Sequence, residues 1–187
     1  GFVDLHVHGG NGADFMDGTA EAFRTVCRCH AKHGTTSLTP TSTVATGPQY
    51  DRFLALCEQL YGDVPGGARV VGSHFYGPYF ARPARGCHPD QEFLTPDEAN
   101  AARFTKLAER MPLVVTVAPE VANAEWLVRT YGPKGVRFNA GHSHATAVPS
   151  HWRCTVTFTC NPPSANVTGL LIVHEAAVSS VWKLCPC

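Results

Sequence analysis

The chain begins with the stretch that decides its fold, Gly1-Phe2-Val3-Asp4-Leu5-His6-Val7-His8-Gly9-Gly10. Its apolar residues predict a strand over residues 2–8. Side chains two residues apart lie on the same face of a strand, so His6 and His8 point together from the end of this one. The glycines that follow allow the chain to turn sharply. The sequence therefore predicts two imidazoles at a strand end, which is where parallel barrel enzymes carry their chemistry.

Strand patterns and helix patterns alternate over the first 140 residues. Strands are predicted at residues 2–8, 35–41, 69–75, 113–118 and 136–140, with helices over 19–33, 49–61, 95–110 and 122–131. The third helix has a start signal in which Thr95 is the cap and Pro96 is the first helical residue. Strict alternation predicts parallel β/α units, which build either an open doubly wound sheet or part of an eight-stranded barrel.

The polar residues that follow the strands decide between these two folds. Every predicted strand is followed by such a group: His6 and His8, residues 39–43, residues 74–78, residues 119–120 and residues 142–144. In a barrel the strand ends form one ring around a single site, whereas an open sheet gathers its ligand groups at one switch point. We therefore predict an α/β fold with parallel strands, an incomplete (β/α)8 TIM-type barrel of about five to six β/α units.

Composition limits the possible partners and the location. Fifteen Lys and Arg balance fifteen Asp and Glu among 187 residues, so the composition indicates no nucleic-acid partner. No apolar run approaches the roughly 20 residues that span a bilayer, and we expect no membrane partner. The eight cysteines show no Cys-x-x-Cys spacing, which argues against a zinc ribbon. Scattered free thiols in a reducing, cytoplasmic compartment are favoured over a disulfide framework.

Several motifs, taken in order, resemble a known family. They are Phe2 to Gly10 with Ala13-Asp14-Phe15, Gly34-Thr35-Thr36, Gly72-Ser73-His74-Phe75-Tyr76-Gly77-Pro78-Tyr79-Phe80, Gly86-Cys87-His88, Ala118-Pro119-Glu120 and Gly141-His142-Ser143-His144-Ala145-Thr146. In this order they resemble the N-acetylglucosamine-6-phosphate deacetylases of the amidohydrolase superfamily. The resemblance covers residues 1–146, and a set of ordered motifs is far more specific than any single one.

The resemblance implies a metal-dependent amide hydrolase that removes acetate from N-acetylglucosamine 6-phosphate in cytoplasmic amino sugar catabolism, usually as a homodimer. A divalent cation, zinc or iron, would polarise the acetyl carbonyl and acidify a bound water. By resemblance, His142 matches a metal-binding histidine, and His6 and His8 match a pair that supports a second metal position. His88 matches a histidine that approaches the sugar. No catalytic residue is assigned, because the aspartate of the family belongs to a later strand than this chain contains.

Two departures from the family pattern are visible. Tyr76 stands where the family has a glutamate that is a principal metal ligand, and a phenol with a pKa of about 10 is a far weaker ligand. Activity should therefore be impaired. The match also ends after residue 147, so we divide the chain into a partial barrel, residues 1–147, and an unmatched tail, residues 148–187, in which residues 156–160 could form a strand. We interpret the chain as truncated, with an aberrant tail.

Two alternative functions stay open. Tyr76 and the absent aspartate are also typical of a non-catalytic remnant of the family, which would bind metal or a partner without turnover. Another amidohydrolase, such as a cyclic amidase or a deaminase, would also begin with His-x-His. The Gly-Thr-Thr and Gly-Pro-Tyr-Phe stretches favour the sugar phosphate deacetylase over these enzymes.

Overall fold

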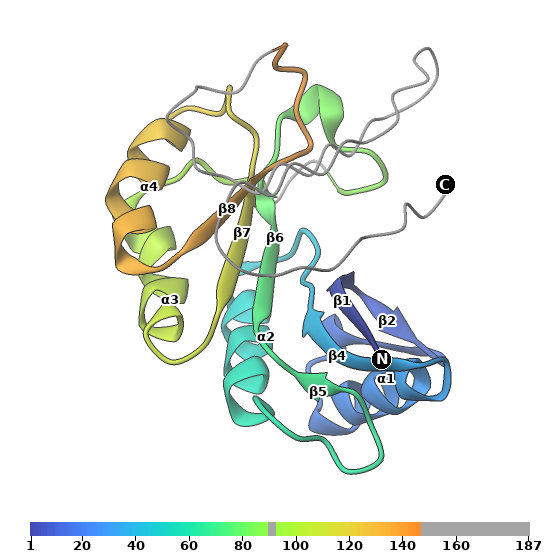
Figure 1. Ribbon diagram of the computed structural model, residues 1–187. Coiled ribbons are helices and arrows are strands. Elements are labelled where there is room, and N and C mark those ends of the chain that lie inside the picture. Colours follow the sequence, from blue (N-terminus) through green and yellow to red (C-terminus); the bar gives the residue numbers. More distant parts are fainter. Residues whose placement is uncertain (90–92, 147–187) are drawn as a thin grey trace.

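The structure is a computed structural model, and it describes residues 1–89 and 93–146 (Figure 1). The tail assigned to residues 148–187 and the possible strand over residues 156–160 lie outside the described residues.

The strands of the described part form two parallel sheets and one small hairpin. The first sheet has the order β1 (Phe2–Val7), β4 (Thr35–Pro40), β5 (Arg69–Val70). The second has the order β6 (Ser73–Tyr79), β7 (Leu113–Val117), β8 (Arg137–Ala140). The pairings β1–β4, β4–β5, β6–β7 and β7–β8 are all parallel, so the predicted parallel β/α units are confirmed.

The two sheets are joined through β4. Its Ser37 pairs with Arg69 of β5, and just beyond its end Thr41 forms a parallel bridge with His74 of β6. The amide of Ser42 donates to the carbonyl of His74 at 3.0 Å. Strands β5 and β6 therefore continue one another as the third predicted strand, interrupted over residues 71–72. Neighbouring strands follow chain order across both sheets, which is the order of a barrel wall rather than of a doubly wound sheet.

The described strands do not close into a barrel. Among them, β1 has only β4 as a parallel neighbour and β8 has only β7. On β1 the side chains of Phe2, Val3 and Leu5 are 72%, 42% and 43% exposed, as expected for the edge of an arc that lacks a neighbour. The five-unit parallel arc is observed, and the eight-stranded barrel stays a prediction.

Four α-helices connect the strands of the described residues: α1 (Ala20–Lys32), α2 (Gly47–Gln59), α3 (Glu98–Ala108) and α4 (Ala124–Tyr131). Helix α1 begins after Thr19, whose hydroxyl accepts the amide of Ala22 at 3.1 Å. Figure 1 shows α3 and α4 on one side of the second sheet. Each helix buries its apolar face against the strands, as its sequence period requires.

One aromatic core holds the two sheets together. The ring of Phe75 on β6 lies 4.7 Å from that of Tyr50 on α2 and 5.3 Å from that of Phe104 on α3. A second contact of 4.7 Å joins Phe15 and Phe23 under the first sheet. All five side chains are at most 1% exposed and belong to one cluster, so the strand ends are fixed relative to one another.

Two local features differ from the sequence prediction. After His8 the chain forms an antiparallel hairpin, β2 (Gly9–Gly10) with β3 (Ala13–Asp14), rather than a simple turn. Asn11 and Gly12 at its tip have φ of 54° and 76°, the left-handed conformation that two-residue hairpin turns need. The prediction that Thr95 caps the third helix was wrong. Asp97 is the cap, because its carboxylate accepts the amide of Asn100 at 2.7 Å.

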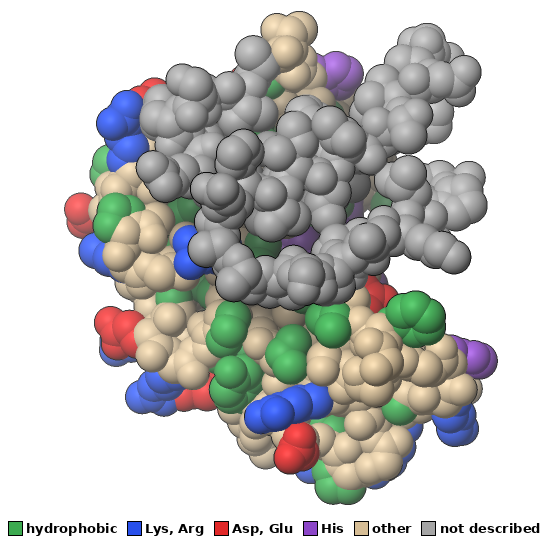
Figure 2. Space-filling model, viewed as in Figure 1, with side chains coloured by type: hydrophobic (Ala, Val, Ile, Leu, Met, Phe, Trp, Pro, Cys, Tyr) green, Lys and Arg blue, Asp and Glu red, His purple; other side chains and the backbone are tan. Residues whose placement is uncertain are grey.

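The surface of the described part agrees with the neutral charge balance. On the face shown in Figure 2, the basic and acidic side chains that can be seen are interspersed. Arg103 and Asp51 form an ion pair at 2.5 Å. No helix among the described residues is long and apolar enough to cross a membrane. Cys27, Cys29, Cys57 and Cys87 are free thiols, as predicted, while the other four cysteines lie outside the described residues.

The corrected helix cap predicts a difference between two substitutions. Asp97→Ala should lower the free energy of unfolding by about 1 kcal/mol, because the Asn100 amide loses its acceptor. Thr95→Ala is the matched control and should change stability by less than about 0.5 kcal/mol. Urea unfolding followed by circular dichroism measures both. An equal or larger loss for Thr95→Ala would restore the original cap assignment.

Candidate functional site

Five histidines gather around the ring of Tyr76 at the ends of the parallel strands. They are His6 in β1, His8 directly after it, His74 in β6, His88 in the loop after the 3-10 helix Arg82–Ala84, and His142 after β8. Their ring centroids lie 4.6, 5.5, 5.2, 5.8 and 5.2 Å, respectively, from that of Tyr76. All four predicted site residues, His6, His8, His88 and His142, are therefore brought together, although they span 137 positions of the sequence.

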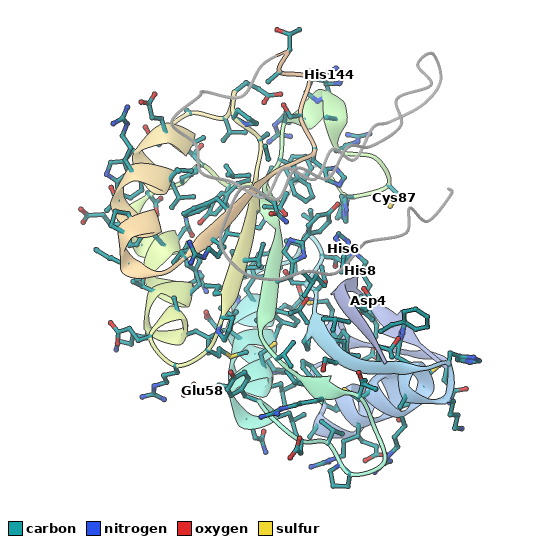
Figure 3. The ribbon with its side chains drawn as sticks, viewed as in Figure 1. Asp4, His6, His8, Glu58, Cys87 and His144 are labelled. Carbon is teal, nitrogen blue, oxygen red and sulfur yellow. The ribbon has the colours of Figure 1, made fainter. Side chains whose placement is uncertain are left out.

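Backbone pairing at the strand ends positions the first histidines. The amide of Thr41 donates to the carbonyl of Val7 at 2.8 Å, and the Thr41 hydroxyl accepts the Val7 amide at 2.9 Å. Because Thr41 also bridges to His74, the ring of His6 comes within 5.0 Å of the ring of His74. Figure 3 shows His6 and His8 next to each other at the end of β1.

His6 and His8 face each other through their Nε2 atoms, which are 2.9 Å apart. One of these nitrogens donates a proton to the other. The same separation is spanned when two bonds of about 2.1 Å reach one cation at roughly 90°, so the pair alone has the spacing of a chelate. This agrees with the prediction that both side chains leave the strand on one face.

His142 is held in a fixed tautomer. Its Nδ1 donates to the carbonyl of Ala84 at 2.8 Å, which leaves Nε2 with a lone pair, and this lone pair accepts the hydroxyl proton of Tyr76. The ring of Phe80 stacks on the imidazole with centroids 3.9 Å apart and planes at 11°. Tyr76 is 5% and His142 is 9% exposed, so this hydrogen bond lies inside the protein.

A carboxylate holds the loop that carries His142. The φ of His142 is 49°, a left-handed conformation that is unfavourable for a residue other than glycine. Glu120, in the loop after β7, accepts the Ser143 hydroxyl at 2.6 Å and the His144 amide at 2.7 Å. His144 itself is exposed and lies away from the cluster (Figure 3).

Burial keeps the imidazoles neutral. Burial, with a smaller contribution from the neighbouring imidazoles, lowers the pKa of His74 to about 3 and the pKa values of His6 and His88 to about 4. The pKa values of His8 and His142 are also lowered, chiefly by burial. Neutral imidazole is the form that binds metals and accepts protons, so at neutral pH the cluster offers nitrogen lone pairs to a metal ion or a proton.

The present arrangement does not fit a resident metal ion. Within the part of the chain that the structure describes, no group of three or more His, Cys, Asp or Glu side chains is placed to hold one. His6 and His8 converge, but the Nε2 of His142 is directed at the Tyr76 hydroxyl instead. The metal-ligand roles of these three histidines, and the role of His88 toward a sugar, stay predictions.

Three residues of the site received no role from the sequence. His74 lies between the His6 ring and Thr116, whose hydroxyl contacts its Nε2 at 2.7 Å. Phe80 covers His142, as described above. The available signal for His74 was its spacing of two from Tyr76, the same period that links His6 and His8. No pattern in the sequence connects Phe80 or Thr116 with a histidine far away in the chain.

The fold and the site define a parallel β/α protein with imidazoles collected at the carboxyl ends of its strands. Comparisons with known proteins identify the relatives of this segment. N-acetylglucosamine-6-phosphate deacetylase of Mus musculus is 35% identical over 152 residues, 78% of this chain and 36% of that protein. N-acetylgalactosamine-6-phosphate deacetylase of Escherichia coli O157:H7 is 32% identical over 145 residues, 78% of this chain and 38% of that protein.

A solved structure agrees with the sequence relatives. A mutant N-acetyl-D-glucosamine-6-phosphate deacetylase from Mycobacterium smegmatis, in complex with N-acetyl-D-glucosamine-6-phosphate, superposes with a TM-score of 0.70 at 29% identity, over 78% of this chain and 37% of that one. No protein-family model matches the chain. The chain is homologous to N-acetylglucosamine-6-phosphate deacetylases over 78% of its length, and spans little more than a third of the curated relatives it matches.

The lowered pKa values predict that acid destabilises this protein. An unfolded imidazole has a pKa of about 6.5, so between that pH and about 4 the unfolded chain binds more protons than the folded one. Stability should therefore be full above about pH 6.5 and fall as the pH approaches 4. Thermal unfolding at about pH 7.5 and about pH 5 measures this, with a lower Tm expected in acid.

Two substitutions locate the origin of this acid sensitivity. His88→Gln removes one half-buried imidazole at similar volume and should narrow the difference in Tm. His144→Gln, at an exposed position outside the cluster, should leave the difference as it is. Equal Tm values at the two pH values in the unaltered protein would contradict the neutral, buried state of the cluster.

Proposed function

We propose that this chain is a segment of a hydrolase that removes the acetyl group from N-acetylglucosamine 6-phosphate, in cytoplasmic amino sugar catabolism. The proposal is carried by one observation: the four histidines that match the deacetylase motifs, His6, His8, His88 and His142, lie at a single site around Tyr76. The relatives are named as deacetylases of acetylated amino sugar 6-phosphates, and one solved relative holds such a ligand. The proposed assembly is a homodimer.

The ligand proposal follows from the donors at the site. His88 is half-buried at the edge of the cluster, with its ring 5.2 Å from that of His142 and 5.3 Å from that of Phe80. A neutral imidazole in this position can donate to or accept from a sugar hydroxyl, and the face of Phe80 is apolar. We assign His88 to the sugar. The relatives include deacetylases of both the gluco and the galacto sugar, so the galacto epimer is the natural comparison ligand.

The proposed cofactor is a divalent cation, zinc or iron, with His6, His8 and His142 as ligands. Such a cation supplies a polarised carbonyl and an acidified water to an amide hydrolase. In this chain the Tyr76 hydroxyl occupies the lone pair that His142 would offer. We therefore propose that deacetylation by this chain is impaired.

A second function is favoured by the same hydrogen bond. A segment whose His142 is bonded to a phenol could bind an amino sugar phosphate without hydrolysing it. The non-catalytic function and the hydrolase function share the ligand and differ in turnover, so one experiment with two readouts separates them.

Binding and turnover of N-acetylglucosamine 6-phosphate test the proposal. Ligand-observed NMR should detect binding to the purified chain, and His88→Ala should weaken it by about fivefold, the loss of one hydrogen bond. His144→Ala is the matched control and should bind as the unaltered chain does. Glucosamine 6-phosphate, which lacks the acetyl group, should bind more weakly.

The turnover readout is acetate release with added zinc or iron. For this chain we expect none above the protein-free background, the result that favours the non-catalytic function over hydrolysis by the chain itself. Release that a chelator abolishes and zinc restores would contradict the proposed impairment. Absence of binding, or equal loss in the two histidine variants, would contradict the proposed ligand and the role of His88.

A further inference from the structure

The hydrogen bond between Tyr76 and His142 has a defined direction. Because the Nδ1 of His142 donates to the Ala84 carbonyl at 2.8 Å, its Nε2 has no proton and can only accept. The Tyr76 hydroxyl therefore donates to Nε2. An imidazole nitrogen offers a single lone pair, so the atom of His142 that could bind a cation is already used.

Further contacts prevent His142 from turning away from this bond. Phe80 stacks flat on one face of the imidazole at 3.9 Å. The backbone is fixed as well, because the His142 carbonyl accepts the Ala81 amide at 3.0 Å and Glu120 holds the next two residues. The partner of Nε2 is therefore set by the side chain at position 76, and not by rotation of the histidine.

The ring of Tyr76 also stands between His142 and the His6–His8 pair. Its centroid lies 4.6 Å from that of His6, 5.5 Å from that of His8 and 5.2 Å from that of His142. The ring is fixed on β6, where the Tyr76 amide and carbonyl both bond to the Ser42 hydroxyl at 2.8 Å. A cation shared by these histidines would need the volume that the phenol fills.

We propose that Tyr76 is a blocking residue, which closes a histidine site to divalent cations by filling its centre and bonding the lone pair of His142. The inference rests on the proposed function, from which the identity of the site as a metal position is taken. A weak ligand at position 76 would still contribute to metal binding. In the blocking role, the hydroxyl of Tyr76 instead competes with the metal for His142.

The competing role for Tyr76 is that of a phenolate ligand. A phenol has a pKa of about 10, and as a ligand it must lose its proton. The blocking role and the ligand role make opposite predictions for the loss of the hydroxyl alone. If Tyr76 blocks, Tyr76→Phe frees the Nε2 of His142 and raises metal affinity. If Tyr76 is a ligand, the same change lowers it.

The experiment measures zinc affinity of the full chain by competition with a chromophoric chelator. Relative to the unaltered chain, Tyr76→Phe should bind zinc about fivefold more tightly, since one hydrogen bond no longer has to be broken. Tyr76→Glu, which supplies a carboxylate, should bind more tightly still, by roughly 100-fold. Cobalt(II) spectra of the same variants report the coordination without any assay of activity.

Two controls make the assignment specific. Tyr79→Phe is the matched change on the same strand, where the buried hydroxyl has no hydrogen-bond partner among the described residues, and it should leave zinc affinity unchanged. Adding His142→Ala to the Tyr76→Phe chain should remove the gained affinity. Tyr76→Leu removes the ring together with the hydroxyl, so it should bind zinc more tightly than Tyr76→Phe, and it also tests the blocking role if Tyr76→Phe does not fold.

The outcomes decide between the roles. Tighter zinc binding in Tyr76→Phe that depends on His142 supports blocking. Weaker binding in Tyr76→Phe overturns it in favour of the ligand role, and unchanged binding shows that the hydroxyl does not block. These results are independent of the sugar-binding measurement, so failure of the proposed function and failure of this inference are distinguishable.

Discussion

The parallel pairing of successive strands is the constraint on which the site depends. Each strand of the arc lies beside the next one along the chain, and all of them end at the same edge. The backbone bridge between Thr41 and His74 carries this order from the first sheet to the second. The aromatic core under Phe75 then fixes the two sheets against each other. As a result, side chains more than a hundred residues apart meet at one place.

Such convergence has an electrostatic consequence. Several imidazoles that share a buried volume cannot all be charged, because each loses its hydration and repels the others. The imidazoles are therefore neutral, and their nitrogen lone pairs need a partner, either a cation or a proton. In this chain the partners are internal: His6 and His8 share one proton, and Tyr76 supplies another to His142. The phenol of Tyr76 therefore decides how the lone pair of His142 is satisfied within the cluster.

Much of the fold could be predicted from the sequence, because the signals were local. The helical period of the apolar residues and the stop at Gly34 predicted α1 within one or two residues of its observed ends. The two-residue spacing of His6 and His8 placed them on one face of the strand. The hairpin after His8 was missed, since its strands are only two residues long. The cap of α3 was misplaced because Thr95 and Asp97 are both good caps, and only the Asn100 amide distinguishes them.

The site was predictable only in part. Motifs identified which histidines belong together, and topology then placed them around one centre. The bond from Tyr76 to His142 was out of reach, since it joins residues 66 positions apart and depends on the left-handed φ of 49° at His142. The same holds for the stacking of Phe80, which follows from the loop conformation and not from any sequence period.

The Tyr76–His142 hydrogen bond is tested most directly by measuring the protonation state of His142 by NMR, from long-range proton–nitrogen correlations of the imidazole. We predict a neutral ring with its proton on Nδ1, and a slowly exchanging Tyr76 hydroxyl proton that lies close enough to that ring to give a nuclear Overhauser effect. A proton on Nε2, or a rapidly averaging mixture of the two tautomers, would contradict the Tyr76–His142 bond at the centre of the site.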